Sequence, residues 1–216
     1  MLKKIINLFK LGRKVAKSDI LIVTSRFQEP PLIVKILFKI LSFSFSPKKP
    51  VEINKDEGQR LSSSLEEMGT TFIKLGQFLV TRPDIIGEEL SMKLENLQDR
   101  LPPFSLNQAK EIIKNDLGND IYNSIIDLSE PVAAASIAQV HKAKINDDGT
   151  IKDVAIKILR PNIKKIFNDE IDAMMLFAFL IESFVKKTKR LKLVEVVFLL
   201  KEITNLEMDL RFEAAA

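Results

Sequence analysis

The chain has 216 residues, 46% of them hydrophobic and 29% charged, and this balance predicts a folded globular protein of one or two domains. It has no cysteine, which excludes disulfides and thiolate metal sites, and a single histidine argues against a zinc site. The net charge of +4 is modest, but the basic residues are unevenly distributed.

The first seventeen residues predict a basic amphipathic helix, with six basic side chains and no acidic one. At helical spacing, one face carries apolar residues and the other carries basic ones: Leu2, Ile5, Ile6, Phe9 and Ala16 against Lys3, Lys10, Arg13, Lys14 and Lys17. Such a helix either lies on an anionic membrane surface or packs on the protein, and the sequence leaves both interpretations open. A signal peptide would need a longer apolar core and a small-residue cleavage site.

Prolines divide the region that follows. Two proline-containing stretches, at residues 30–31 and 47–50, bracket a short apolar and basic helix predicted near residues 32–43. No segment reaches the roughly 20 apolar residues that a helix needs to cross a bilayer, so the chain as given is not expected to span a membrane.

Three further helices are predicted downstream. Apolar spacing predicts one helix over residues 56–79 and another over residues 85–100. Ser105 is placed to cap a third helix, because Gln108 stands three residues later, as in a capping box. Gly118 marks the expected end of that helix.

A small antiparallel sheet is predicted after Leu128. Residues 132–144 and 153–159 are rich in alternating or β-branched apolar residues, and the Asn146-Asp-Asp-Gly149 stretch between them is typical of a hairpin turn. Helical spacing then resumes over residues 163–187 and again from residue 194. Helices around one small sheet predict an α+β chain that is mostly helical.

Three motifs carry candidate chemistry: Lys74-Leu-Gly-Gln77, Ala133-Ala-Ala-Ser136 leading to Gln139-Val-His141, and Val154-Ala-Ile-Lys157. In the small lobe of a protein kinase, a glycine-rich loop covers the nucleotide phosphates and a strand lysine supplies the positive charge that holds them. Here alanines replace the glycines, and the loop is stiffer because alanine avoids positive φ. Taken alone, Lys157 would be an ordinary charged strand end, and the alanine segment a strand packed closely under a helix.

In their order and their residues, these motifs resemble those of the UbiB family of atypical kinase-like proteins, which serve ubiquinone biosynthesis. The likeness is tightest at residues 68–84, which include the lysine-x-glycine-glutamine signature at Lys74 to Gln77, and at residues 97–104. It extends over residues 56–216 and implies a kinase-like small lobe that binds ATP with magnesium. The implied ATP-binding residues are Val132, Ala133, Ala134, Ala135, Ser136, Ile137, Ala138, Gln139, Val140 and Lys157.

The resemblance also implies regulatory contacts. Lys74, Gly76 and Gln77 would gate the nucleotide cleft, and an acidic pair, Glu207 and Asp209, would engage that gating segment.

A further glutamate, Glu213, would form the ion pair with Lys157. Spacing alone predicts one helix on which Asp209 and Glu213 share a face, and a solvated acidic face would fit that spacing equally well.

A kinase-type phosphotransfer site also requires an aspartate base, an asparagine and a magnesium-binding aspartate from the large lobe. The only histidine, His141, lies upstream of the lysine, so a His-containing catalytic loop is missing. The sequence therefore predicts a small lobe with a helical N-terminal extension and no large lobe, catalytic base or magnesium ligands. Whether such a chain is an enzyme stays open, and little activity is expected of it alone.

Three segments are predicted. Residues 1–55 form a basic amphipathic helical segment, residues 56–128 a helical extension with the Lys74 motif, and residues 129–216 the kinase-like small lobe. Expected partners are ATP, ubiquinone-biosynthesis proteins and an anionic membrane surface, with the chain peripheral on the cytoplasmic side.

The alternative is a non-catalytic module that docks on a quinone-biosynthesis assembly or an anionic membrane through its basic helices. Nucleic-acid binding is not expected, because aromatic residues are not interleaved with the basic ones and the chain has one tyrosine and no tryptophan.

Overall fold

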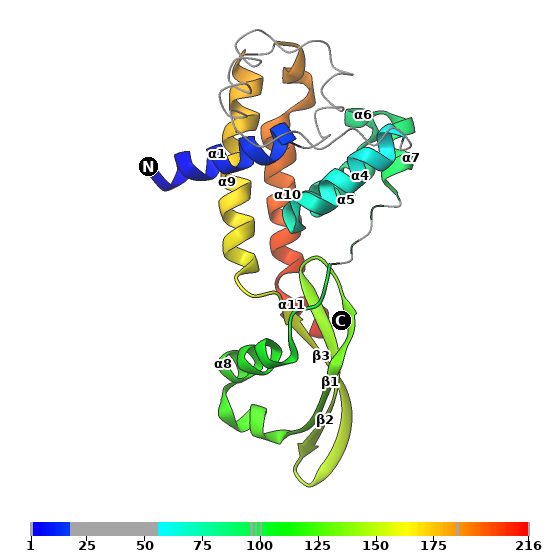
Figure 1. Ribbon diagram of the computed structural model, residues 1–216, viewed down its shortest axis with the longest axis vertical. Coiled ribbons are helices and arrows are strands. Elements are labelled where there is room, and N and C mark those ends of the chain that lie inside the picture. Colours follow the sequence, from blue (N-terminus) through cyan, green and yellow to red (C-terminus); the bar gives the residue numbers. More distant parts are fainter. Residues whose placement is uncertain are drawn as a thin grey trace. The chain divides into compact units, whose positions relative to one another are not determined.

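The computed structural model describes residues 2–17, 56–95, 97, 99, 101–184 and 186–215 (Figure 1). The chain divides into two compact units. The helical unit combines Met1–Gln98 with Lys165–Glu207, and the sheet unit combines Asp99–Lys164 with Met208–Ala216. Each unit is therefore assembled from segments that are far apart in the sequence.

This division cuts across the three segments expected at residues 1–55, 56–128 and 129–216, because the chain leaves the helical unit, builds the sheet and then returns. The helix predicted near residues 32–43 lies outside the described residues.

The helical unit is built from these elements: α1 (Leu2–Lys17), α4 (Glu57–Met68), α5 (Thr70–Val80), α6 (Pro83–Ile86), α7 (Glu88–Leu94), most of α9 (Ile163–Phe184), the 3-10 helix η1 (Lys186–Leu191) and α10 (Leu193–Glu207). A capping box starts α4. The Asp56 carboxylate accepts from Gln59 N at 2.8 Å, and the Gln59 side chain accepts from Asp56 N at 3.2 Å.

Two glycines divide helices that the apolar spacing predicted to be continuous. Gly69 has a φ of 97° and splits the helix predicted over residues 56–79 into α4 and α5. Gly87 has a φ of 83° and separates α6 from α7, and α7 ends at Leu94 instead of residue 100. Glycine adopts positive φ without the steric cost that a Cβ brings, so it interrupts a helix while the apolar spacing continues.

The core of the helical unit consists of large apolar side chains from five helices. Its fully buried members are Leu61 and Leu65 of α4, Phe72 and Ile73 of α5, Leu90 and Leu94 of α7, Phe167 and Ile171 of α9, and Leu200 of α10. Each buried side chain of this size contributes about 1.5–3 kcal/mol to folding. The packing holds α5, which carries the Lys74 motif, within the unit.

The basic helix α1 packs partly on the helical unit. Leu11 is buried, whereas Ile6 and Phe9 remain 45% and 47% exposed. Lys14 has three contacts within the unit: a hydrogen bond to the Met68 carbonyl, an ion pair with Glu170 and a cation–π contact with Phe72. The predicted amphipathic helix is confirmed, but its buried residue, Leu11, was not among those placed on the apolar face.

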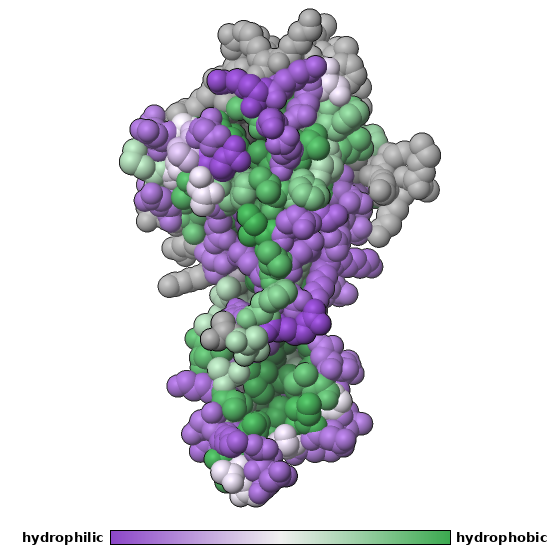
Figure 2. Space-filling model, turned by 180° about the vertical axis from the view of Figure 1, so that it is seen from behind, coloured by the Kyte–Doolittle hydropathy of each residue, from purple (hydrophilic) through white to green (hydrophobic). Residues whose placement is uncertain are grey.

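Hydrophobic side chains also gather on the surface of the helical unit, as the green band along it in Figure 2 shows. Large exposed hydrophobic residues of α9 and α10 are Ile166, Leu176, Phe179, Phe198, Leu199, Ile203 and Leu206. Exposed apolar clusters on soluble proteins often mark contact surfaces or promote aggregation.

The sheet unit contains a three-stranded antiparallel sheet with the order β1–β2–β3: β1 (Ile125–Ala134), β2 (Ala138–Asp147) and β3 (Thr150–Leu159). The sequence predicted only two strands, at residues 132–144 and 153–159. The first of these is divided by a turn, and most of β1 was missed. Shifts in the β1–β2 register and Pro131 disturb the alternation on which strand prediction depends.

The predicted hairpin turn between β2 and β3 is confirmed. Asp148 and Gly149 have φ values of 48° and 84°, as in a type I′ turn, and Gly149 N donates to Asn146 Oδ1 at 2.9 Å. This turn keeps ten consecutive residue pairs of β2 and β3 in register, from Ala138 with Leu159 to Asp147 with Thr150. The strand that carries Lys157 is therefore firmly aligned.

One face of the sheet packs against α8 (Leu106–Ser124). Ala109, Ile113 and Ile158 form the buried cluster, and partly buried side chains surround it: Phe104, Ile112, Tyr122, Ile125, Leu128 and Ile156. The predicted capping box of Ser105 and Gln108 is confirmed. At Gly118 the φ of 82° breaks the helical geometry, but a second helical piece continues to Ser124.

The last helical segment is interrupted. α10 ends at Glu207, and a separate helix, α11 (Leu210–Ala215), follows Met208 and Asp209. The prediction that Asp209 and Glu213 share one helix face was wrong, because Asp209 precedes α11 and accepts a hydrogen bond from Arg211 N at 3.2 Å. Glu207 and Glu213 consequently belong to different units.

The predicted fold class, α+β and mostly helical with a small antiparallel sheet, is confirmed. In the part of the chain that the structure describes, none of the helices combines the length and the apolar character that crossing a bilayer requires.

Candidate functional site

Lys157 lies near the end of β3 and pairs with Glu213 of α11. The distance between Lys157 Nζ and Glu213 Oε2 is 2.5 Å, and the side chains are 35% and 61% exposed. Because exposed ion pairs are screened by water, this pair adds little to the free energy of folding. Its significance is geometric, since it holds the ammonium group in one place.

Strand register places Lys157 opposite Val140 of β2, and Val140 opposite Ala133 of β1. Directly opposed residues share a face of the sheet, so these three side chains form one row. Gln139 and Ile158 belong to the neighbouring row, on the other face, which packs against α8. The candidate lysine and the start of the alanine segment therefore occupy the face that α8 does not cover.

The alanine segment forms the turn between β1 and β2. Val132 and Ala133 are exposed, whereas residues 136–139 are buried. Ala135 N donates to Ala138 O at 2.8 Å, and Ser136 N donates to Asp99 Oδ1 at 2.8 Å. These two turn amides, which the sequence assigned to nucleotide phosphates, already have acceptors within the protein.

Arg160, which follows β3, binds three carbonyl groups around this turn. Its Nε and Nη2 donate to Ala135 O at 2.9 and 2.8 Å, Nη1 donates to Pro102 O at 2.9 Å, and Nη2 also donates to Leu101 O at 3.1 Å. Burial lowers the pKa of the Arg160 guanidinium, and the nearby Asp99 charge partly opposes that shift. Arg160 therefore ties the alanine turn to the segment before α8.

Sequence analysis missed the roles of Arg160 and Asp99. In the sequence, Arg160 is a single basic residue between the strand predicted at residues 153–159 and Pro161, and nothing around it indicates a function. Asp99 stands within residues 97–104, where the resemblance was strong but no function followed from it. The charge of Asp99 within such a stretch is the one sequence signal that could have indicated a role. Its partner, the Ser136 amide, is 37 residues away and is identified only from the fold.

Gln139 and His141 form a buried polar network beneath the turn. Phe104 N donates to Gln139 Oε1 at 2.9 Å, and Gln139 Nε2 donates to Phe104 O at 3.1 Å. Gln139 Nε2 also lies 2.9 Å from His141 Nε2, and His141 Nδ1 lies 2.7 Å from Ser129 O. Because a carbonyl can only accept, Nδ1 carries the hydrogen and Nε2 accepts from the amide. The Gln139 side chain thus serves the structure of the turn.

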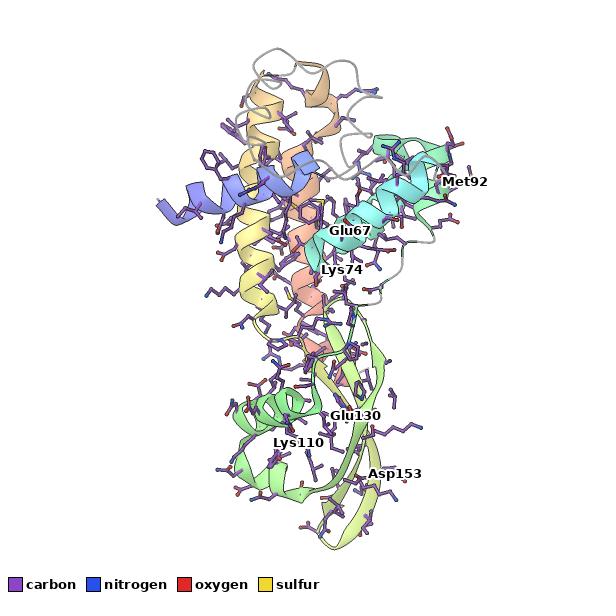
Figure 3. The ribbon with its side chains drawn as sticks, viewed as in Figure 1. Glu67, Lys74, Met92, Lys110, Glu130 and Asp153 are labelled. Carbon is purple, nitrogen blue, oxygen red and sulfur yellow. The ribbon has the colours of Figure 1, made fainter. Side chains whose placement is uncertain are left out.

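The Lys74 motif lies on α5 in the helical unit (Figure 3). Lys74 Nζ pairs with Glu207 Oε2 of α10 at 2.7 Å, and the Lys74 side chain is only 10% exposed. Asp209, the other acidic residue assigned to this motif, pairs with Arg211 at 2.5 Å within the sheet unit. Glu207 therefore makes the implied contact with Lys74, whereas Asp209 is engaged by Arg211.

Gly76 has a packing role. A Cβ added there would lie 2.5 Å from Leu97 Cδ2 and 2.8 Å from Leu65 Cδ1, both shorter than atoms tolerate. Gln77, one position further on, is half-buried.

The hydrogen bond from Arg211 also affects Asp209 directly. Arg211 Nε donates to Asp209 Oδ1 at 2.7 Å, and this bond lowers the pKa of Asp209 to about 2. Asp209 is thus a permanent anion at neutral pH.

Among the described residues, no group of three or more acidic or histidine side chains is arranged to hold a metal ion. The arrangement in the sheet unit is therefore a positioned cation beside a closed turn. It can attract and orient an anion such as a phosphate group, for which an ammonium is a suitable point charge.

A family model for the ABC1 atypical kinase-like domain matches residues 96–216. The chain is 37% identical over 188 residues to the probable protein kinase UbiB of Marinobacter nauticus. This match covers 87% of this chain and 33% of that protein. It is 34% identical over 215 residues to the probable protein kinase UbiB of Aliivibrio fischeri, covering 99% of this chain and 38% of the relative. A similar match, 36% over 186 residues, is to the protein of that name in Shewanella baltica. The chain spans about a third of the length of these relatives, between 33% and 38%.

Proposed function

Because the chain belongs to the ABC1 atypical kinase-like family, we propose that its sheet unit binds the phosphate groups of ATP at Lys157. We further propose that it does so as part of a UbiB-type atypical kinase or ATPase that supports ubiquinone biosynthesis. The name of the relatives, probable protein kinase UbiB, supports the kinase class for those proteins.

The observation that carries this proposal is the Lys157–Glu213 ion pair, with Nζ and Oε2 2.5 Å apart. In protein kinases, a strand lysine must pair with a helix glutamate before it can hold the nucleotide phosphates. Lys157 stands on a strand and Glu213 on a helix of the same unit. The pairing directs the ammonium towards Glu213, on the face of the sheet that also carries Val140 and Ala133.

The rest of the site limits how the nucleotide can bind. The amides of Ala135 and Ser136 are occupied, so Lys157 is the principal phosphate-binding group of the described residues. A magnesium ion would arrive with the nucleotide and neutralise part of the phosphate charge. The gating role implied for Lys74, Gly76 and Gln77 stays a prediction, supported by the Lys74–Glu207 contact.

Isothermal titration calorimetry with Mg-ATP tests the proposal. Lys157→Ala should weaken binding by roughly tenfold or more, the worth of one charge-assisted contact. The matched control is Lys152→Ala, which removes another β3 lysine from an exposed pair with Asp147 at 2.5 Å. Absence of binding by the unaltered chain, or equal affinity in the Lys157 and Lys152 variants, would contradict the assignment.

A second function, docking on an anionic membrane, is favoured by the surface of α1. Ile6 and Phe9 are half-exposed, and Lys10 and Arg13 are exposed on the same helix. Basic amphipathic helices bind anionic lipid through both kinds of residue. This function requires no nucleotide and could accompany the first.

Vesicle sedimentation tests this second function with phosphatidylserine-containing and neutral vesicles at low and high salt. Binding should require the anionic lipid, weaken as salt increases, and decrease in Phe9→Ser. Phe198→Ser, a change at an equally exposed phenylalanine of α10, is the control. Equal losses in the two variants, or salt-independent binding to neutral vesicles, would rule out docking through α1.

A further inference from the structure

A single peptide group in the alanine turn is held from both sides by oppositely charged side chains. It joins Ala135 to Ser136. Two guanidinium nitrogens of Arg160 donate to its carbonyl oxygen at 2.9 and 2.8 Å. The Asp99 carboxylate accepts from its N–H at 2.8 Å. Hydrogen bonds with an ionised partner are about twice as strong as those between neutral groups.

This arrangement fixes the direction of the N–H bond. In a planar trans peptide the carbonyl and the N–H point to opposite sides, so neither group can be reoriented without the other. Turning the Ser136 N–H elsewhere would break the Asp99 hydrogen bond and both Arg160 hydrogen bonds. Serine at position 136 adds to the restraint, because rotating this peptide changes the φ of Ser136, and a residue with a Cβ resists the positive φ that a glycine would adopt.

Arg160 is itself held by further contacts. Arg160 donates to the carbonyls of Leu101 and Pro102, and its own N–H donates to Ile137 O at 2.9 Å. Asp99 and residues 101–104 thus form a frame for the turn. The partly buried pairing of Gln139, on β2, with Phe104 holds the same frame.

We infer that Asp99 and Arg160 lock the Ala135–Ser136 peptide, and that the Asp99 carboxylate, as an internal anion, withholds the Ser136 N–H from nucleotide phosphates. The lock itself follows from the hydrogen bonds of the turn, whereas the withholding of a phosphate donor rests on the nucleotide binding proposed above. Both residues are positioning residues. Asp99 also places a negative charge where a phosphate would otherwise approach the turn.

Amide hydrogen exchange, followed by NMR on the whole 216-residue chain, tests the lock without any nucleotide. In the unaltered protein the Ser136 amide should be protected. Asp99→Ala and Arg160→Ala should each accelerate its exchange by about tenfold or more, the worth of one charge-assisted hydrogen bond. Arg160→Lys should restore only part of the protection, because an ammonium lacks the planar fork that binds one carbonyl twice. Exchange in Asp99→Ala at the unaltered rate would overturn the lock.

Calorimetry with Mg-ATP tests the withholding. Asp99→Ala should bind about tenfold more tightly than the unaltered chain, and its Ser136 amide resonance should shift with nucleotide. Asp99→Asn, which removes the charge but keeps an oxygen for the amide and preserves the fold best, should show a smaller gain. Asp153→Ala removes an exposed carboxylate of β3 and is the control (Figure 3).

The possible results separate the two ideas. If Asp99→Ala binds Mg-ATP no more tightly than the unaltered chain, or if Asp153→Ala gains as much affinity as Asp99→Ala, the withholding is overturned while the nucleotide site stays intact. If neither the unaltered chain nor Asp99→Ala binds Mg-ATP, the proposed function and the withholding both fail. The exchange rates then still decide whether the lock exists.

Discussion

Gln139 and Phe104 stand 35 positions apart in the sequence and exchange two hydrogen bonds, one from Phe104 N to Gln139 Oε1 and one from Gln139 Nε2 to Phe104 O. The side-chain amide thereby takes the place of a strand backbone beside Phe104. Gln139 Nε2 also lies 2.9 Å from His141 Nε2, and His141 Nδ1 lies 2.7 Å from Ser129 O, so both ring nitrogens of the buried histidine have partners.

Gln139→Ala should destabilise the protein by about 2–4 kcal/mol, because it leaves the partly buried backbone groups of Phe104 and one nitrogen of the buried His141 without partners. Urea unfolding followed by circular dichroism measures the change. Asn119→Ala, at an exposed amide on α8, is the control and should change stability by less than about 0.5 kcal/mol. Equal stability of the two variants would mean that water replaces the Gln139 network.

Gly76→Ala should destabilise the helical unit by about 1–3 kcal/mol, since its methyl group would overlap the buried side chains of Leu97 and Leu65. Thermal unfolding measures this. In a double-mutant cycle, Leu97→Ala should relieve the overlap, so that the double variant is more stable than the sum of the single effects. Strict additivity would show that Gly76 is required for another reason.

Glu207→Ala should destabilise the helical unit by about 1 kcal/mol, a modest value because Glu207 is 41% exposed while its partner Lys74 is nearly buried. The matched control is Glu195→Ala on the same helix. Glu195 pairs with Lys192, and both side chains are about two-thirds exposed, so Glu195→Ala should change the free energy of unfolding by close to zero. Chemical unfolding compares the two, and a loss in Glu195→Ala as large as in Glu207→Ala would contradict a special role for the Lys74 contact.

The carboxyl group of Asp209 should titrate near pH 2, because hydrogen bonds from Arg211 lower its pKa from 3.8 to about 2. A lowered folded-state pKa contributes stability that is complete above the ordinary pKa of 3.8 and is lost as the pH falls towards 2. Carboxyl carbon NMR measures the midpoint. Arg211→Ala should move it up towards 3.8, whereas Arg82→Ala, which removes the partner of Asp84, should leave it in place. A midpoint unaffected by Arg211→Ala would mean that another group lowers this pKa.

Local signals in the sequence predicted much of the fold. The capping box at Ser105 and Gln108, the hairpin turn at Asn146 to Gly149 and the basic helix at the start each depend on neighbouring residues, and each is present. Strand β1 was largely missed because bulges and Pro131 erase its alternation. The break between α10 and α11 was missed because apolar spacing continues through it.

The candidate site was only partly predictable, since its contacts join residues that are far apart. The pairing of Lys157 with Glu213 followed from the family resemblance, not from spacing. Asp99 and Arg160 could not be assigned, because a carboxylate 37 residues from the amide that it binds leaves no periodic pattern. Their role depends on contacts that Asp99 and residues 101–102 make with Arg160 and with the turn between β1 and β2.

The central claim is that Lys157 holds the phosphate groups of a nucleotide. The most direct measurement compares the affinities of Mg-ATP and adenosine, which lacks phosphate, for the unaltered chain and for Lys157→Ala. We predict that the unaltered chain prefers Mg-ATP by at least about tenfold and that this preference largely disappears in Lys157→Ala. An undiminished preference in the variant would contradict the account.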